Sequence, residues 1–198
     1  MANLVAGMLR DRGRRVRVIW LKSMHTAAYL TFVLLMRAGI CETIVNPSGH
    51  SVRRLRIPRH AKKIWLFIEF VGLMPSLFAK VCLPTILRYD IVADRFLVDT
   101  VVSIGMRIRD PSFMDSLFCR ILLSFVPHSS LLVHLDIGFN EIVHRRPDIE
   151  YTCSEIYQLI GWYGILARRL SAYSINTSRT RIRDTLHIIS NLISSRER

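Results

Sequence analysis

The stretch that most constrains the fold is the run from Tyr89 to Phe96, YDIVADRF, in which a short apolar segment ends abruptly in an acid and a base. Its β-branched centre is typical of a buried strand. Ligands of open α/β sheets bind in the crevice beyond the carboxyl ends of the strands. The run therefore predicts that Asp94 and Arg95 stand at an active-site edge. Taken alone, the same pair would also suit an ordinary cap between a strand and a helix.

Further short apolar runs alternate with longer helical patterns along the chain. This alternation favours an α/β fold with a doubly wound parallel sheet and helices on both faces. The 198 residues, 51% of them apolar, suffice for one domain that covers residues 1–198. The predicted strands are 15–21, 89–94, 131–136 and 172–175. The predicted helices are 1–12, 26–38, 61–87 with an interruption around Pro75, 96–106, 111–123, 139–145, 153–170 and 181–194.

The chain is strongly basic, with a formal net charge of +13. Such a charge points to anionic partners, namely nucleotides, nucleic acid or an anionic membrane surface, and the sign alone does not choose among them. The segment 46–60 concentrates arginines among prolines and a glycine, so we expect an exposed basic connection. A solvated charge run and a ligand contact both remain open for it. It lacks interleaved aromatic residues, which argues against a specific nucleic-acid partner.

A membrane span is the next alternative to weigh. The best candidate is 64–87, which Glu69, Pro75, Lys80 and Pro84 interrupt. Charges near the middle of a bilayer are costly, so we expect a buried helix pair and no membrane partner. No cleavable signal peptide is visible. The four cysteines, Cys41, Cys82, Cys119 and Cys153, form no metal-binding pattern, so free thiols in a reducing cytoplasm are the simplest interpretation.

Polar residues collect at the ends of three predicted strands. These are Asp94 with Arg95, then Asp136, then Asn176 with Thr177. Phosphoryl transfer requires positioning, Mg²⁺ and positive charge rather than covalent chemistry from the protein. Asp94 suits a magnesium ligand or an acceptor for a magnesium-bound water, and arginines grip phosphates with paired hydrogen bonds.

Two more arginines, Arg145 and Arg146, follow the predicted helix 139–145 and begin a lid-like segment at 144–152. On their own they would suit the preference of helix C-termini for positive charge. They gain meaning from their place between the strand ends at Asp136 and Asn176.

Four blocks in order resemble the thymidylate kinase-like branch of the nucleoside monophosphate kinases, a P-loop fold. They are IVADRF at 91–96, PHSSLLVHLD at 127–136, EIVHRRPD at 141–148 and SINTSR at 174–179. Each block is weak alone, and four in the same order are stronger. The resemblance covers about residues 1 to 195.

The resemblance implies ATP-dependent phosphorylation of a nucleoside monophosphate, thymidylate or a similar nucleotide. Asp94 would bind Mg²⁺, Arg95 would orient the acceptor phosphate, and a closing lid would bring Arg145 and Arg146 to the transition state. Asn176 and Thr177 would border the adenine of ATP. Many kinases of this family form homodimers, which leaves a homodimer open for this chain.

The resemblance also assigns acceptor contacts. Lys22 and His25 fall where the family contacts the acceptor phosphate or sugar. In the helix where family members usually carry an arginine that reads the pyrimidine, this chain has Glu69 instead. A carboxylate in an apolar run is costly unless it is paired, so Glu69 should meet either a substrate group or an arginine from elsewhere.

One family feature is absent from the sequence. No Gly-rich loop ending in Gly-Lys-Ser/Thr occurs in the 198 residues, although such loops cradle ATP phosphates. Residues 2–9 resemble the helix that follows this loop, so the resemblance implies a central strand missing between those that end at Asp94 and Asp136. We expect a start codon assigned too late, and the alternative is a non-catalytic basic binding module that kept the scaffold.

Overall fold

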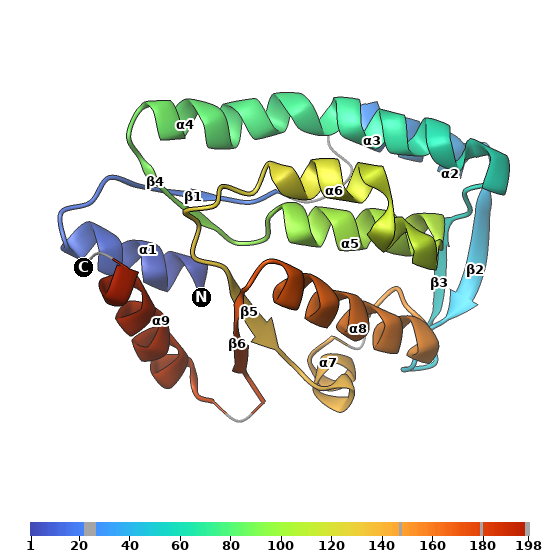
Figure 1. Ribbon diagram of the computed structural model, residues 1–198. Helices are drawn as coiled ribbons and strands as arrows, with labels where there is room; N and C mark the ends of the chain where they lie inside the picture. Colours follow the sequence, from blue (N-terminus) through green and yellow to red (C-terminus); the bar gives the residue numbers. More distant parts are fainter. Residues whose placement is uncertain (22–26, 147, 179, 197–198) are drawn as a thin grey trace.

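The computed structural model describes residues 1–21, 27–146, 148–178 and 180–196 (Figure 1). The protein is a mixed α/β chain with 60% helix and short parallel strand pairs. The described strands are β1 Val16–Ile19, β2 Cys41–Val45, β3 Ser51–Leu55, β4 Asp90–Ala93, β5 Val133–Asp136 and β6 Tyr173–Asn176. The described α-helices are α1 Ala2–Asp11, α2 Ala27–Arg37, α3 Lys62–Leu77, α4 Leu83–Ile86, α5 Leu97–Ile108, α6 Leu117–Ser124, α7 Phe139–Arg145, α8 Cys153–Arg169 and α9 Ile182–Arg196.

Two separate pairs of parallel strands form the α/β part of the fold. β1 pairs with β4, with Val16 opposite Asp90, and β5 pairs with β6, with Asp136 opposite Asn176. β1, β4 and β5 lie inside the predicted ranges, and β6 is displaced by one residue from the predicted 172–175 to 173–176. The four strand predictions are therefore confirmed in position, with one boundary shifted. Within the described part of the chain, β4 and β5 belong to different sheets.

The alternation of side chains along the strands distributes them between two apolar clusters, because successive residues of a strand point to opposite faces. In β1, Val18 joins a cluster with α1 and α9, whereas Ile19 joins the main core with α3, α5, α6 and α8. In β4, Val92 likewise joins the cluster with α1 and α9, and Ile91 joins the main core. Helices therefore cover both faces of the β1–β4 pair. Val133 of β5 also belongs to the α1 and α9 cluster, so both strand pairs share that helical layer.

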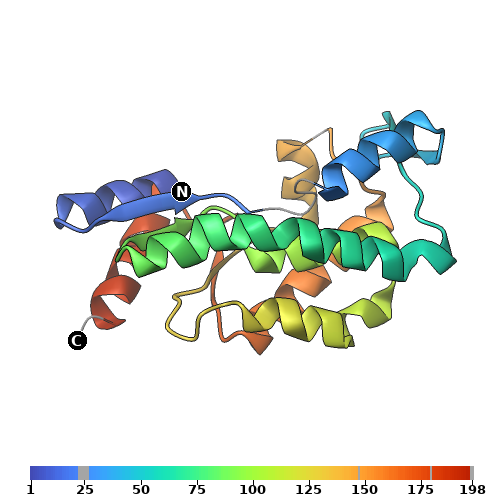
Figure 2. The ribbon, with the colours of Figure 1, turned by 90° about the horizontal axis from the view of Figure 1, so that it is seen from above.

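The predicted helix 61–87 continues through its predicted interruption. α3 contains Pro75 in its interior and is followed by a π-helical turn, Phe78–Cys82, and then by α4. Pro75 lies on the exposed side of the helix, while Leu73 and Leu77 hold the opposite side in the core. The prediction of a buried helix pair is therefore wrong in two respects: the segment is one continuous helical stretch, and only one of its sides is buried, with Phe67 and Ile86 exposed on the other. Figure 2 shows this segment running across one side of the molecule, with α2 beside α3.

The segment 46–60 is more ordered than the exposed connection we expected. β2 and β3 form an antiparallel hairpin, with Val45 opposite Ser51. The turn between them is held by Asn46, whose Oδ1 accepts hydrogen bonds from the amides of Ser48 and His50 at 3.1 and 2.9 Å. The sequence analysis missed this hairpin because it read the prolines and arginines as a loop and did not assign the alternating residues of β2.

Helices α5 and α8 approach closely at Gly105. A Cβ atom placed on Gly105 would lie 2.7 Å from Cζ3 of Trp162 and 2.9 Å from Cδ1 of Phe113. Both aromatic residues are buried in the main core. The bare backbone of Gly105 is therefore the surface on which the ring of Trp162 packs.

We expect Gly105→Ala to destabilise the protein by about 1 to 2 kcal/mol, because overpacking of a filled core costs more than the gain in helix propensity of up to about 1 kcal/mol. Gly164→Ala in α8 is the matched control. A Cβ there meets nothing within 4 Å, so this variant should gain about 0.5 to 1 kcal/mol. Chemical denaturation of both variants measures the difference, and equal stabilisation by both would contradict the proposed packing.

Candidate functional site

The first strand end lies where β4 turns into α5. The ladder with β1 extends past the strand, since the Asp94 amide donates to the Ile19 carbonyl at 2.9 Å and the Leu21 amide donates to the Arg95 carbonyl at 3.2 Å. The Asp94 side chain is exposed. Arg95 has a φ of 80°, a left-handed conformation that is uncommon for a residue with a side chain and often marks functional turns. The tertiary fold thus imposes a special turn on the Asp-Arg pair.

Helix α5 begins immediately after this turn. The Asp99 side chain accepts a hydrogen bond from the Phe96 amide at 3.1 Å, which caps the first turn of the helix. The negative carboxylate also interacts favourably with the positive end of the helix dipole. The helix then runs almost wholly buried from Leu97 to Ile108. Asp94 and Arg95 are therefore held between a paired strand and a capped, buried helix.

The second strand end joins Asp136, Asn176 and Thr177. Asp136 and Asn176 are partners in the β5–β6 register. The amide and the hydroxyl of Thr177 both donate to the Asp136 carbonyl, at 2.8 and 2.9 Å. Asn176 uses its Oδ1 to accept from the Ser178 amide at 3.0 Å. The predicted nucleotide-base residues thus form a turn that is hydrogen-bonded to Asp136, at the carboxyl ends of two parallel strands.

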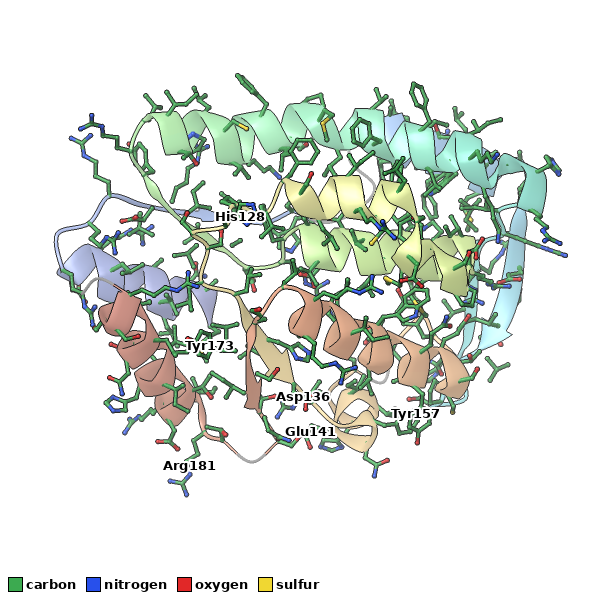
Figure 3. All side chains as sticks on the ribbon, in the orientation of Figure 1. His128, Asp136, Glu141, Tyr157, Tyr173 and Arg181 are labelled. Carbon is green, nitrogen blue, oxygen red and sulfur yellow. The ribbon has the colours of Figure 1, made fainter. Side chains whose placement is uncertain are left out.

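Arg145 and Arg146 lie at the end of α7, close in sequence to this second edge. Arg145 donates to Glu141 at 2.7 Å, one helical turn away, and Arg146 is exposed at the helix C-terminus. Figure 3 labels Asp136 at the end of β5 and Glu141 on α7 beside it, with Tyr157 of α8 nearby. The exposed ion pair of Arg145 with Glu141 contributes only about 0.3 to 0.5 kcal/mol. A phosphate could therefore replace Glu141 as the partner of Arg145.

The C-terminal part of the lid-like segment 144–152 is held by hydrogen bonds. Nδ2 of Asn46 donates to the Ile149 carbonyl at 3.2 Å, so the turn of the β2–β3 hairpin contacts this segment. Thr152 caps α8, and the Glu155 carboxylate accepts a hydrogen bond from the Thr152 amide at 2.9 Å. The hairpin and the lid-like segment, which the sequence analysis treated separately, are thus joined.

Three predicted acceptor contacts have different outcomes. Glu69 is buried, with 2% of its side chain exposed, and forms an ion pair with Arg107 at 2.9 Å. Of the two partners expected for Glu69, the structure shows the arginine, and its carboxylate is engaged inside the protein. Lys22 and His25 lie outside the described residues.

A polar cluster that no sequence pattern predicted links the two strand pairs. Its members are Asp99 of α5, Tyr163 of α8, His134 of β5 and Ser174 of β6. The Tyr163 hydroxyl donates to Asp99 at 2.8 Å, and its ring stacks on His134 with centroids 6.2 Å apart. His134 Nδ1 lies 3.3 Å from the Ser174 hydroxyl. We name this set the Asp99–Tyr163 cluster.

Burial raises the pKa of Tyr163, and the neighbouring Asp99 carboxylate raises it further. The phenol therefore remains protonated and donates to Asp99 throughout the neutral range. Since Asp99 also caps α5 directly after Arg95, this hydrogen bond connects the turn at Arg95 to α8 and β5. No single-residue signal in the sequence marks Tyr163, because its two partners, Asp99 and His134, come from two other elements.

A second concentration of charge lies at the opposite end of α5. Arg54 of β3 donates to Glu42 and to Glu155, both at 2.7 Å, and Arg109 also pairs with Glu42. Arg54 holds the pKa of Glu155 below its usual value against the opposing effect of burial. This network fastens the hairpin to α5 and α8, which gives the basic segment a structural role.

Next to this network is a cavity of about 230 Å³. Its cationic lining residues are Arg56, Arg59, Lys62, Arg107 and Arg109. Three of them already have acidic partners, because Lys62 pairs with Asp110 at 3.3 Å and the other two with Glu69 and Glu42. The cavity is lined by the far end of α5, so it is separate from the turn at Asp94.

No group of three or more potential metal-ligating side chains occurs among the residues that the structure describes. Magnesium, however, keeps several water ligands and needs only one or two carboxylates when a substrate phosphate completes its shell. The exposed carboxylate of Asp94 fits that limited role. It does not make a site that would hold a metal without a phosphate.

The raised pKa of Tyr163 generates a prediction on alkaline stability. A group whose pKa is higher in the folded protein stabilises the fold below its unfolded pKa, near 10, and this contribution is lost as the pH rises. One such tyrosine changes the free energy of unfolding by about 1.4 kcal/mol per pH unit above that value. Tyr163→Phe should lower the free energy of unfolding at pH 7 by about 1 kcal/mol, because the Asp99 hydrogen bond is lost. It should also make the free energy of unfolding fall less steeply above about pH 10, because the titrating hydroxyl is gone.

Tyr157→Phe in the same helix is the control, because Tyr157 is exposed and stacks on Phe139 at 4.6 Å. Denaturant titrations at several pH values between about 8 and 11 measure both slopes. An alkaline slope in Tyr163→Phe equal to that of the unsubstituted protein would refute the burial of this hydroxyl.

Comparison with known proteins adds no relative to this description. No protein-family model matches the chain, and a search of curated proteins finds no match. The functional argument therefore depends on the two strand ends and the cluster that connects them.

Proposed function

We propose that the protein transfers the γ-phosphoryl group of ATP to a nucleoside monophosphate, with thymidylate or a similar nucleotide as the acceptor. One observation carries the proposal: Asp94 with Arg95, and Asp136 with Asn176 and Thr177, stand at the carboxyl ends of two parallel strand pairs that share a helical layer. Such strand ends are where ligands of α/β sheets bind. The order of the four sequence blocks that resemble thymidylate kinase-like proteins adds to it.

The proposal includes a doubly wound sheet in which one more parallel strand lies between β4 and β5. Its support is that β4 and β5 each pair on one side only among the described residues, since strand edges without a partner leave backbone groups without ladder hydrogen bonds. Both strands also contribute to the same apolar cluster with α1 and α9, through Val92 and Val133. A strand in this place would be apolar on both faces.

The residues at the first edge would receive the acceptor. The guanidinium of Arg95 can grip a phosphate with two parallel hydrogen bonds, and its left-handed turn sets the direction in which the side chain leaves the backbone. Asp94 would bind magnesium, directly or through a water. The magnesium ion would neutralise charge on the phosphates of ATP.

The residues near the second edge would receive ATP. Asn176 and Thr177 would border the base, with their turn held by the Asp136 carbonyl. Arg145 and Arg146 would approach the phosphates from α7, and Arg145 would exchange Glu141 for a phosphate oxygen. Positive charge placed where negative charge develops is the main source of rate acceleration in phosphoryl transfer.

A second candidate function is a non-catalytic binding module for anionic ligands. The absence of a Gly-Lys-Ser/Thr loop from the 198 residues favours it, because such loops bind the phosphates of ATP in the P-loop kinases. The fastening of segment 144–152 to Asn46 is also more easily understood in a protein that does not close a lid. The two candidate functions differ in one measurable property: a kinase transfers phosphate to an acceptor, and a binding module does not.

The test measures transfer of labelled phosphate from ATP to a panel of nucleoside monophosphates. It uses the 198-residue chain and a version that carries the residues encoded in frame upstream of Met1. We expect magnesium-dependent transfer by the longer version and poor ATP binding by the shorter one. Tight magnesium-dependent ATP binding by the shorter version would contradict the requirement for an additional loop. Absence of transfer with every acceptor would favour the binding module.

Arg95→Gly is the decisive variant, since glycine accepts a positive φ and removes only the side chain. In the version that transfers phosphate, we expect kcat/KM to fall at least about 100-fold. Arg88→Gly is the matched control, because Arg88 precedes the same strand and also has a positive φ, 58° against 80° for Arg95. It should retain activity. Equal activity of the two variants would remove Arg95 from the proposed mechanism.

A further inference from the structure

The outer face of the α3–α4 segment is an exposed apolar stripe. Its members, which we call the α3–α4 stripe, are Ile64, Phe67, Val71, Phe78 and Ile86, with exposed fractions of 64, 66, 47, 59 and 71%. Their spacings of three, four, seven and eight residues place them on one side of the helix. The opposite side, with Trp65, Leu73 and Leu77, is buried in the main core.

Neighbouring elements add to this exposed apolar surface. Helix α2 packs against α3, and Tyr29, Leu30 and Leu34 of α2 are exposed by 53, 65 and 65%. Figure 2 shows α2 and the α3–α4 segment side by side. Contiguous exposed apolar patches are uncommon on monomeric soluble proteins and mark interaction surfaces. The α3–α4 stripe therefore indicates a binding surface.

The charges around the stripe indicate what this surface binds. Between residues 59 and 89 the only carboxylate in the sequence is Glu69, and it is buried in its ion pair with Arg107. Arg59 and Lys63 are exposed at one end of the helix, and Arg88 is exposed at the other. Lys80, partly exposed, donates to the Trp20 carbonyl at 3.0 Å. The exposed charge along this helix is thus entirely positive.

We propose that the α3–α4 stripe docks on the surface of a bilayer that contains anionic phospholipids, with the helix lying in the plane of the membrane. An amphipathic helix of this type places its apolar face at the boundary between headgroups and acyl chains, and its cations contact anionic headgroups. Phe67 and Phe78 would enter that boundary. The cations at the two ends of the helix would bind lipid phosphates.

The charge of the whole protein selects a membrane over a second copy of the chain. Each copy carries a formal net charge of +13, so a dimer through the stripe would bring like charges together. An anionic bilayer has the opposite effect, because it attracts basic surfaces.

Docking in the plane is also favoured over spanning. The helical segment Arg59–Ile86 is 28 residues long and apolar enough to cross a membrane by length and composition, with 28% of its most apolar window buried. Its inner face, however, holds Glu69 in the 2.9 Å ion pair with Arg107 of α5. A spanning helix would have to leave this pair and the core contacts of Trp65. Docking exposes nothing that is now buried.

The experiment is flotation of the purified full chain with vesicles of phosphatidylcholine alone or of phosphatidylcholine with phosphatidylserine. We expect the bound fraction to be at least about tenfold higher on the anionic vesicles and to fall when salt rises from about 0.1 to 0.5 M, because salt screens surface charges. The double variant Phe67→Glu/Phe78→Glu should lose at least about tenfold of this binding.

The control is Tyr157→Glu/Ile182→Glu, which changes the net charge equally and replaces residues exposed by 61 and 67%. Figure 3 labels Tyr157, and Arg181 next to Ile182, on the side of the molecule away from α3 and α4. This variant should bind like the unsubstituted protein, and circular dichroism checks that both variants fold. Equal binding by the two double variants would overturn the role of the stripe.

Three other results would overturn the proposal. Equal binding to neutral and anionic vesicles would show that anionic lipid is not required for binding. Retention of the protein in membranes after an alkaline carbonate wash would indicate a spanning helix. A concentration-dependent dimer in sedimentation velocity, lost in Phe67→Glu/Phe78→Glu and without vesicle binding, would assign the stripe to a second copy.

Discussion

The burial of α5 is the constraint on which the rest of the structure depends. Leu97, Val101, Ile104 and Ile108 all lie in the main core, and Gly105 lets Trp162 of α8 approach the helix backbone. Because α5 is enclosed by α3, α6 and α8, its two ends have little freedom. The N-terminal end positions the turn at Asp94 and Arg95, and the C-terminal end supplies Arg107 and Arg109 to the ion pairs of α3 and the hairpin. One helix thus connects the candidate site to the basic end of the molecule.

Charge in this protein is divided between internal ion pairs and an exposed surplus. Arg54, Arg107 and Arg109 are bound to Glu42, Glu69 and Glu155, so part of the arginine content holds elements together. Removing one partner of the buried pair of Glu69 and Arg107 is costly, since it leaves the other charge without compensation. The surplus cations remain at the surface around α3 and α4 and at the end of α7. Composition alone reports only the sum of these two groups.

Parallel strands and helix patterns were largely predictable, because they depend on local sequence. The four runs around Val18, Val92, Val133 and Ile175 are short and apolar, the first two are also rich in β-branched residues, and each is found as a strand in the parallel pairs. The hairpin of β2 and β3 was not predicted, since its order comes from contacts of Asn46, Glu42 and Arg54 with distant residues. The continuity of α3 through Pro75 was missed for a related reason: packing of Leu73 and Leu77 outweighs the local cost of a proline.

The sequence by itself determined which residues stand at strand ends, because the length of an apolar run and the polar residue after it are local facts. It therefore placed Asp94, Asp136 and Asn176 at the carboxyl ends of strands. Only the tertiary structure decided that Asp136 and Asn176 are paired across two strands, that Glu69 pairs with Arg107, and that Tyr163 connects α8 to Asp99. It also decided which face of the long apolar helix is buried. These contacts join residues that are far apart in the chain, and a local pattern carries no information on which partner will fill the space beside a side chain.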